Sequence, residues 1–115
     1  MQGNLYPQPD AELLRLRRDS APKQLDAFRA FSEQVFADGA LDRRTKQLIA
    51  VAVAHVTQCP YCIAGHTKAA VRHGATAQEL MEAIWVAAEM RAGGAYAHSI
   101  LALTAVEATE STRAG

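Results

Sequence analysis

The sequence predicts an all-α fold, a bundle of five or six helices in a single domain. A chain of 115 residues suits one hydrophobic core. Half of its residues are apolar but only 6% are aromatic, a composition typical of closely packed helices rather than of strands. Wherever the apolar periodicity is clear, it has the spacing of three and four that indicates a helix. We expect residues 21–110 to form the domain, preceded by an arm and a short helix at residues 1–20.

The first elements follow from turn residues and apolar spacing. Residues 1–10 are rich in Pro, Gly and Asn and predict an irregular arm, and a short charged helix should follow at residues 11–19. Ser20-Ala21-Pro22 then offers an N-cap serine and a proline for the first turn of the next helix, which Asp38-Gly39 should end. Its apolar residues recur at three and four: Leu25, Phe28, Phe31, Val35 and Phe36.

A third and a fourth long helix are predicted around the middle of the chain. Asp42 can cap a helix whose apolar residues cover most of its circumference, so this helix should be largely buried. A new helix should start at Pro60, run to about His73 and be closed by Gly74.

The last part of the sequence predicts two more helices. Thr76 and Glu79 have the spacing of a capping box, which marks a helix start. Gly93-Gly94 should interrupt that helix, and residues 95–108 should form the last one.

Two cysteines near the middle of the chain carry the most specific signal. Proline favours the first helical position, so Pro60 places Cys59 at the N-cap and Cys62 at the third helical residue. Backbone N–H groups without helical partners point there and favour a thiolate. His66 follows Cys62 by four residues and shares its face, so the imidazole can exchange a proton with that thiol. The arrangement supports a cycle in which one sulfur is oxidised to a sulfenic acid, the other condenses with it to a disulfide, and an external reductant restores both.

Two other interpretations of the pair remain open. The cysteines could be small buried hydrophobic residues with an incidental histidine beside them. Cys59, Cys62, His66 and His55 could instead supply four zinc ligands, although tetrahedral zinc sites usually take their second ligand pair from well separated positions. We expect neither a metal nor a cofactor.

Charge and hydropathy exclude several classes of function. Twelve Lys and Arg against twelve Asp and Glu give zero formal charge, without the basic surface expected of a nucleic-acid binder. The N-terminal residues lack the features of a signal peptide, and no apolar stretch approaches the roughly 20 residues of a membrane span. We therefore expect a soluble cytoplasmic protein with no nucleic-acid or membrane partner, in which a vicinal cysteine pair is chemical rather than structural.

Three segments together resemble a known family: residues 46–54, residues 59–66 with the pattern Cys-x-x-Cys-x-x-x-His, and residues 73–76. Over about residues 25–106 the chain is similar to the AhpD-like branch of the carboxymuconolactone decarboxylase superfamily. The resemblance implies a helical homotrimer or homohexamer that reduces hydroperoxides, or passes electrons from a dihydrolipoyl or thioredoxin-like dithiol donor to a peroxiredoxin. It also implies that Cys62 is the peroxidatic cysteine, Cys59 the resolving one and His66 part of a proton relay.

One position departs from that family's pattern. The glutamate of the relay lies twelve residues before the first cysteine, and here Gln47 occupies that position. If the two helices form an antiparallel hairpin, Gln47 should reach His66 through a water, where its amide can orient the imidazole but cannot carry a proton. His55 is the best substitute for the glutamate, and Glu82 and Glu89 are weaker candidates.

Two further functions compete with a peroxidase. The superfamily name suggests a decarboxylase acting on a carboxymuconolactone-like lactone, but decarboxylation does not need a vicinal dithiol. A non-catalytic redox sensor is the other alternative, and Gln47 favours it. A sensor would form the disulfide once for each pulse of oxidant, whereas an enzyme would turn over with added reductant.

Overall fold

The computed structural model describes residues 5–114, which form five helices and no strand. The prediction of an all-α chain with five or six helices is confirmed, whereas residues 1–4 of the predicted arm lie outside the described part. Residues 5–10 have no regular structure. The helices are α1 (Ala11–Ser20), α2 (Pro22–Phe36), α3 (Arg43–Thr57), α4 (Pro60–Arg72) and α5 (Ala77–Ala114).

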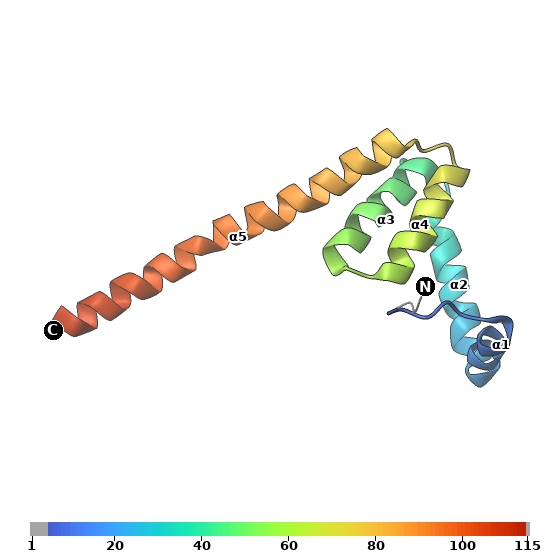
Figure 1. Cartoon of the computed structure of the whole chain (residues 1–115), viewed down its shortest axis with the longest axis horizontal. Coiled ribbons are helices and arrows are strands. Elements are labelled where there is room, and N and C mark those ends of the chain that lie inside the picture. Colours follow the sequence, from blue (N-terminus) through green and yellow to red (C-terminus); the bar gives the residue numbers. More distant parts are fainter. Residues whose placement is uncertain (1–4, 115) are drawn as a thin grey trace.

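The centre of the fold is an antiparallel hairpin of α3 and α4, and the first part of α5 packs against α3 (Figure 1). Val51 and Ala70 are fully buried between these elements, and Leu80 at the start of α5 is buried beside them. Near the end of α3, the guanidinium of Arg91 donates a hydrogen bond to the carbonyl of Val56 at 3.3 Å. Beyond this point α5 continues away from the hairpin (Figure 1).

The predicted caps of the central helices are confirmed. Oδ1 of Asp42 accepts from the N–H of Thr45 at 2.8 Å, at the start of α3. α4 ends before Gly74, which has a φ of 92° that glycine adopts without strain. Before α5, Thr76 Oγ1 accepts from the N–H of Glu79 at 3.1 Å, and Glu79 Oε1 accepts from the N–H of Thr76 at 2.9 Å. This capping box fixes where α5 begins against α3.

The predicted N-cap of α2 is wrong. Ser20 is the last residue of α1, and its hydroxyl donates to the carbonyl of Leu16 at 2.6 Å. A serine hydroxyl readily makes this bond to the carbonyl four residues earlier, which removes it from a capping position. Ala21 is the N-cap instead and has no side-chain oxygen, while Pro22 opens the helix as expected.

The predicted break at Gly93-Gly94 is also wrong, since α5 runs through both glycines for 38 residues. Each glycine in a helix interior costs about 1 kcal/mol relative to alanine, which weakens a helix without ending it. The residues on either side are mostly good helix formers, with Arg91 and Ala92 before the pair and Ala95 and Ala97 after it. The two predicted helices are therefore one.

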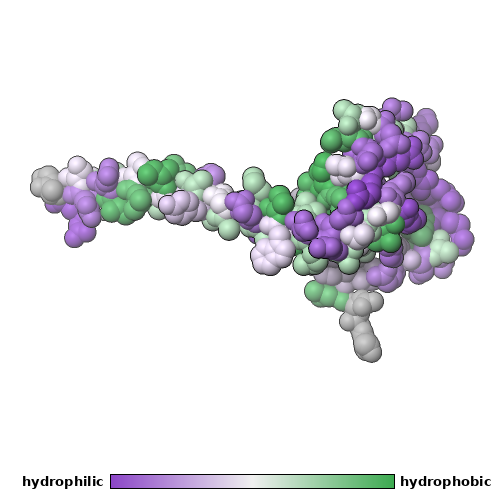
Figure 2. All heavy atoms as spheres, turned by 90° about the horizontal axis from the view of Figure 1, so that it is seen from above, coloured by the Kyte–Doolittle hydropathy of each residue, from purple (hydrophilic) through white to green (hydrophobic). Residues whose placement is uncertain are grey.

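The single chain leaves much apolar surface uncovered, so the prediction that α3 is largely buried does not hold within one chain. Ile49, Val53 and Val56 on α3 are about half exposed. α5 forms a rod that carries apolar patches along its length (Figure 2). Its exposed large apolar residues are Met81, Trp85, Val86, Met90, Tyr96, Ile100, Leu101, Leu103 and Val106. None of the described helices has the combination of length and apolarity that spanning a membrane requires.

Candidate active site

The two cysteines lie at the start of α4, as the sequence predicts. Pro60 is the first helical residue, Cys59 is the N-cap in an extended conformation and Cys62 is the third helical residue. A disulfide joins the two cysteines, whose Cα atoms are 5.2 Å apart. The N–H of Cys62 points at Sγ of Cys59 at a distance of 3.2 Å. When the pair is reduced, this N–H and the positive end of the helix dipole stabilise negative charge on the sulfur.

His66 lies one turn after Cys62 and contacts Gln47 on α3 directly. Nδ1 of His66 is 2.8 Å from Oε1 of Gln47, so the expected bridging water is not needed. Small buried residues such as Ala54 and Ala70 let the two helices approach closely enough for this contact. An amide oxygen only accepts, so Nδ1 carries the hydrogen and donates it, which leaves Nε2 free to accept a proton.

Phe36, the last residue of α2, covers the imidazole. The ring centroids of Phe36 and His66 are 5.2 Å apart and the planes are inclined by 28°, which is a stacked arrangement. The imidazole is thus held by a hydrogen bond from its edge to Gln47, which is 8% exposed, and by the face of Phe36. The sequence analysis assigned Phe36 only to the apolar face of its helix, because its distance from His66 along the chain hides the contact.

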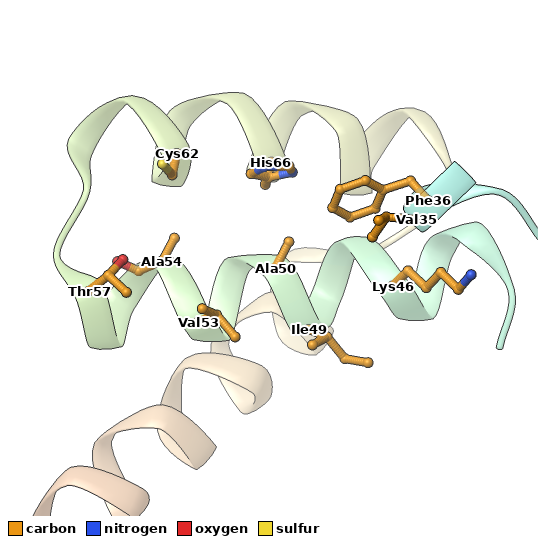
Figure 3. A pocket seen from close by; sticks show the side chains of 10 residues that line it. All are labelled: Val35, Phe36, Lys46, Ile49, Ala50, Val53, Ala54, Thr57, Cys62 and His66. Carbon is orange, nitrogen blue, oxygen red and sulfur yellow. The ribbon is translucent and has the colours of Figure 1, made fainter. Parts of the chain in front are cut away.

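An apolar cavity of about 410 Å³ lies between α3, α4 and the end of α2. Figure 3 shows Cys62 and His66 projecting from α4 toward Ala54 and Ala50 of α3, with Phe36 farther along the cavity. Thr57 and Lys46 are its polar residues besides His66, and Nζ of Lys46 donates to the carbonyl of Ala37. The remaining lining residues are Val35, Ile49 and Val53.

A second cavity, the polar cavity, also reaches Cys62 and His66. It has a volume of about 840 Å³ and extends between α2, the start of α3 and the length of α4. Gln47 and Phe36 line it as well, and its other side chains are mostly polar or charged: Phe28, Ser32, Glu33, Arg43, Tyr61, Ala69, Arg72 and His73. Cys62 and His66 therefore lie between an apolar and a polar space.

His55 does not lie at the sulfurs. Its Nδ1 is 2.8 Å from the carbonyl of Val51 on its own helix, and it lines neither the apolar nor the polar cavity. This placement does not support His55 as a substitute for the family's relay glutamate or as a zinc ligand beside the cysteines. Glu82 and Glu89 are exposed on α5 and line neither cavity.

Comparisons with known proteins identify relatives of this chain. Residues 22–105 match the model of the carboxymuconolactone decarboxylase family. An uncharacterized protein of the cox locus of Paracoccus denitrificans is 72% identical over 82 residues, which cover 71% of this chain and 74% of that protein.

Three solved structures are similar in sequence and fold. A carboxymuconolactone decarboxylase family protein from Legionella pneumophila is 39% identical with a TM-score of 0.64, over 67% of this chain and 69% of the other. A protein from Methanobacterium thermoautotrophicum is 36% identical with a TM-score of 0.68, over 72% and 93%. A family protein from Thermotoga maritima, for which a part in the antioxidative response has been suggested, is 31% identical with a TM-score of 0.53, over 56% and 66%.

Proposed function

We propose that this chain, which belongs to the carboxymuconolactone decarboxylase family, is a thiol-dependent peroxidase and disulfide oxidoreductase. Cys59 and Cys62 form its redox pair, and His66 moves protons at Cys62. One observation carries the proposal: a disulfide joins the N-cap and the third residue of α4, with an imidazole one turn further on the same helix. A structural pair of buried cysteines would not need a histidine held in one tautomer.

In the oxidative half of the cycle, Nε2 of His66 takes the proton of the Cys62 thiol. The thiolate attacks the terminal oxygen of a hydroperoxide, so that a sulfur–oxygen bond forms, the oxygen–oxygen bond breaks and the leaving alkoxide takes the proton from His66. Cys59 then attacks the sulfenic acid at Cys62. The disulfide forms, and the hydroxyl group leaves with the Cys59 proton as water.

In the reductive half, a dithiol donor returns two electrons. Nε2 of His66 first takes a proton from solvent. One donor thiolate attacks Cys59, and the leaving Cys62 thiolate takes this proton from His66. The second donor thiol then attacks the mixed disulfide and gives its proton to Cys59, and the donor leaves as a disulfide. A dihydrolipoyl or thioredoxin-like protein has the required chemistry, and a peroxiredoxin disulfide could take the place of the peroxide as electron acceptor. This chemistry needs no metal or organic cofactor.

Two further features support the proposal. The apolar cavity beside Cys62 offers room for the hydrocarbon part of an organic hydroperoxide. The antioxidative role suggested for the Thermotoga maritima relative belongs to the same class of chemistry.

The proposal includes a homo-oligomer, a trimer or a hexamer, acting in the cytoplasm. The exposed apolar residues of α3 and α5 are the surfaces that other subunits would cover. A pair that must be reduced in every cycle suits a compartment rich in reduced thiols.

The decisive experiment is a steady-state assay of hydroperoxide loss with dihydrolipoamide as reductant. We expect turnover that saturates with both substrates and that disappears in Cys62→Ser. Glu12→Gln, an exposed substitution on α1 outside both cavities, is the matched control and should leave the rate unchanged. If the wild type consumes only one equivalent of peroxide however much reductant is present, the enzyme assignment is wrong.

A redox sensor is the second candidate, and Gln47 favours it because its amide cannot carry a proton away from His66. That single-equivalent result is the behaviour expected of a sensor. A lactone decarboxylase has no use for the vicinal dithiol, so a decarboxylase activity that survives in a Cys59→Ser and Cys62→Ser double variant would favour that third function.

A further inference from the structure

The contact between His66 and Gln47 leaves the imidazole with one exchangeable position. Nδ1 donates to Oε1 of Gln47 and keeps its hydrogen whether the ring is neutral or protonated. Every proton that enters or leaves His66 therefore passes through Nε2. Because the amide of Gln47 cannot pass a proton onward, the ring must exchange with solvent by a route on the other side.

Only one of the two cavities at His66 offers such a route. The apolar cavity is lined mainly by aliphatic and aromatic side chains, and the ammonium of Lys46 in its lining donates a hydrogen bond to the carbonyl of Ala37. The polar cavity is larger and has Ser32 and Glu33 of α2 in its wall. Among the described residues that line either cavity, Glu33 is the one carboxylate.

We propose that Glu33 exchanges protons between solvent and Nε2 of His66 through water in the polar cavity, and so takes over the function of the carboxylate missing at position 47. This inference rests on the proposed redox cycle and names a positioning and relay residue for it. Glu33 lies three residues before Phe36, whose ring stacks on His66, so the same end of α2 provides both the relay and the cover of the imidazole.

Two cationic side chains share the polar cavity with Glu33. Arg43 and Arg72 line the same space, so positive charge stabilises the carboxylate in its ionised form, in which it can accept a proton from solvent. Arg43 also pairs with Asp38, with Nε and Oδ2 3.6 Å apart. The other titratable groups in this wall are the phenol of Tyr61 and the imidazole of His73 at the end of α4.

The relay matters most in the reductive step. His66 is neutral after the oxidative half, because the proton of Nε2 has gone to the alkoxide. Glu33 delivers a proton from solvent to Nε2 through the cavity water. When a donor thiolate attacks Cys59, the disulfide breaks and the leaving Cys62 thiolate takes this proton, so the ring is again neutral for the next oxidative half. No electron passes through Glu33, and the proton it gives up is replaced from bulk water.

The test measures single-turnover reduction of the Cys59–Cys62 disulfide by dithiothreitol between pH 5 and 9, which does not depend on whether a peroxide is the substrate. We expect Glu33→Gln to slow reduction by about tenfold below neutral pH and to change the shape of the pH profile. Glu33→Asp should keep part of the rate. Added formate or acetate should restore the reduction rate of Glu33→Gln in proportion to the concentration of the added acid. Glu12→Gln on α1, an exposed substitution outside both cavities, is the control, and thermal melting shows whether each variant is folded.

Two results would overturn the proposal: a Glu33→Gln protein with the wild-type rate and pH profile, or a slow, folded Glu33→Gln protein that small carboxylic acids do not restore. The second result would mean that Glu33 has only a structural role. If the wild type fails to turn over peroxide while Glu33→Gln still slows disulfide reduction and is restored by acetate, the peroxidase assignment fails and the relay stands.

Discussion

Oε1 of Gln47 accepts a hydrogen bond from Nδ1 of His66 across the α3–α4 hairpin, at a distance of 2.8 Å. In the proposed cycle, Gln47, which stands where the resemblance implies a relay glutamate, therefore still orients the imidazole toward Cys62. Unlike a glutamate, its amide cannot accept a proton. This separates the orienting function of position 47 from its proton-carrying function, and each can be tested alone.

Restoring the carboxylate tests the proton-carrying function. Gln47→Glu should raise peroxide turnover with dihydrolipoamide by roughly tenfold, because a carboxylate at this distance both orients His66 and accepts its proton. Steady-state peroxide loss measures the effect, and Gln47→Leu, which can do neither, should lower turnover below the wild type. An unchanged rate in Gln47→Glu would mean that proton transfer at His66 does not limit the cycle.

The same substitution should reduce the dependence on Glu33. If the carboxylate introduced by Gln47→Glu and the carboxylate of Glu33 offer alternative proton routes, adding Glu33→Gln should cost much less in this background than in the wild type. A double-mutant cycle on the rate of disulfide reduction measures the coupling between positions 47 and 33. Strictly additive effects on the logarithm of the rate would contradict the view that the two carboxylates offer alternative routes for the same proton.

The start of α3 should be sensitive to acid through Asp42. The backbone N–H of Thr45, and then its hydroxyl, hold the pKa of Asp42 below its ordinary value of 3.8. A carboxyl group with a lowered pKa stabilises the fold above its ordinary pKa, and this contribution disappears as the pH falls through the lowered value. The melting temperature of Asp42→Asn should therefore lie below that of the wild type at pH 7, and approach or exceed it as the pH falls through the lowered pKa of Asp42.

The control for this pH series is Asp19→Asn, a substitution of an exposed carboxylate at the end of α1. Its difference from the wild type should vary less between pH 7 and pH 3 than the Asp42→Asn difference. A constant difference between Asp42→Asn and the wild type across the series would show that the charge of Asp42 does not contribute.

The local parts of the site could be predicted from the sequence because they depend on neighbouring residues. Pro60 fixes the helix start, and this alone places Cys59 at the N-cap and His66 one turn after Cys62. The cap at Asp42 and the capping box before α5 are equally local.

The contacts that complete the site depend on how α2 and α3 pack onto α4. The stacking of Phe36 on His66 joins residues 30 positions apart, and no sequence pattern indicates it. The direct hydrogen bond between His66 and Gln47 could not be predicted for the same reason, since the spacing between the hairpin helices depends on their small buried side chains. In the sequence, Glu33 resembles any solvated glutamate of an amphipathic helix, and only the structure shows that it lines the polar cavity.

The predicted break at Gly93-Gly94 was wrong for a different reason. The low helix propensity of glycine lowers the stability of a helix but does not decide where the helix ends.

The exposed apolar surface of α5 predicts self-association. We expect sedimentation at micromolar concentration to give a trimer or a hexamer, because Leu101 and Ile100 are more than 60% exposed in the single chain. Leu101→Glu should shift the distribution toward smaller species and lower the melting temperature by several degrees. Lys23→Glu on α2 is the control and should change neither. A wild-type protein that sediments as a monomer would contradict the prediction.

The last prediction concerns which of the two sulfurs reacts with the peroxide and which one resolves the sulfenic acid. Cys62 has His66 one turn later on the same face of α4, whereas Cys59 lies at the N-cap and its sulfur accepts the N–H of Cys62. Cys59→Ser should therefore still be oxidised at Cys62 but stop as a sulfenic acid, since no second thiol is present to form the disulfide. Cys62→Ser should react with peroxide at least a hundredfold more slowly, because the remaining thiol has no base within one turn.

A sulfenic-acid probe followed by mass spectrometry measures both variants after one equivalent of peroxide. His66→Ala tests whether His66 is the base that makes Cys62 reactive. Removing this base should slow oxidation of Cys62 most strongly near neutral pH. Raising the pH should recover much of the rate, because the thiol then ionises without a base. Labelling of Cys59 in the Cys62→Ser protein at the wild-type rate would reverse the assignment. The order of the two sulfurs would then be set by the N-cap position, where the helix dipole acts most directly, rather than by the histidine.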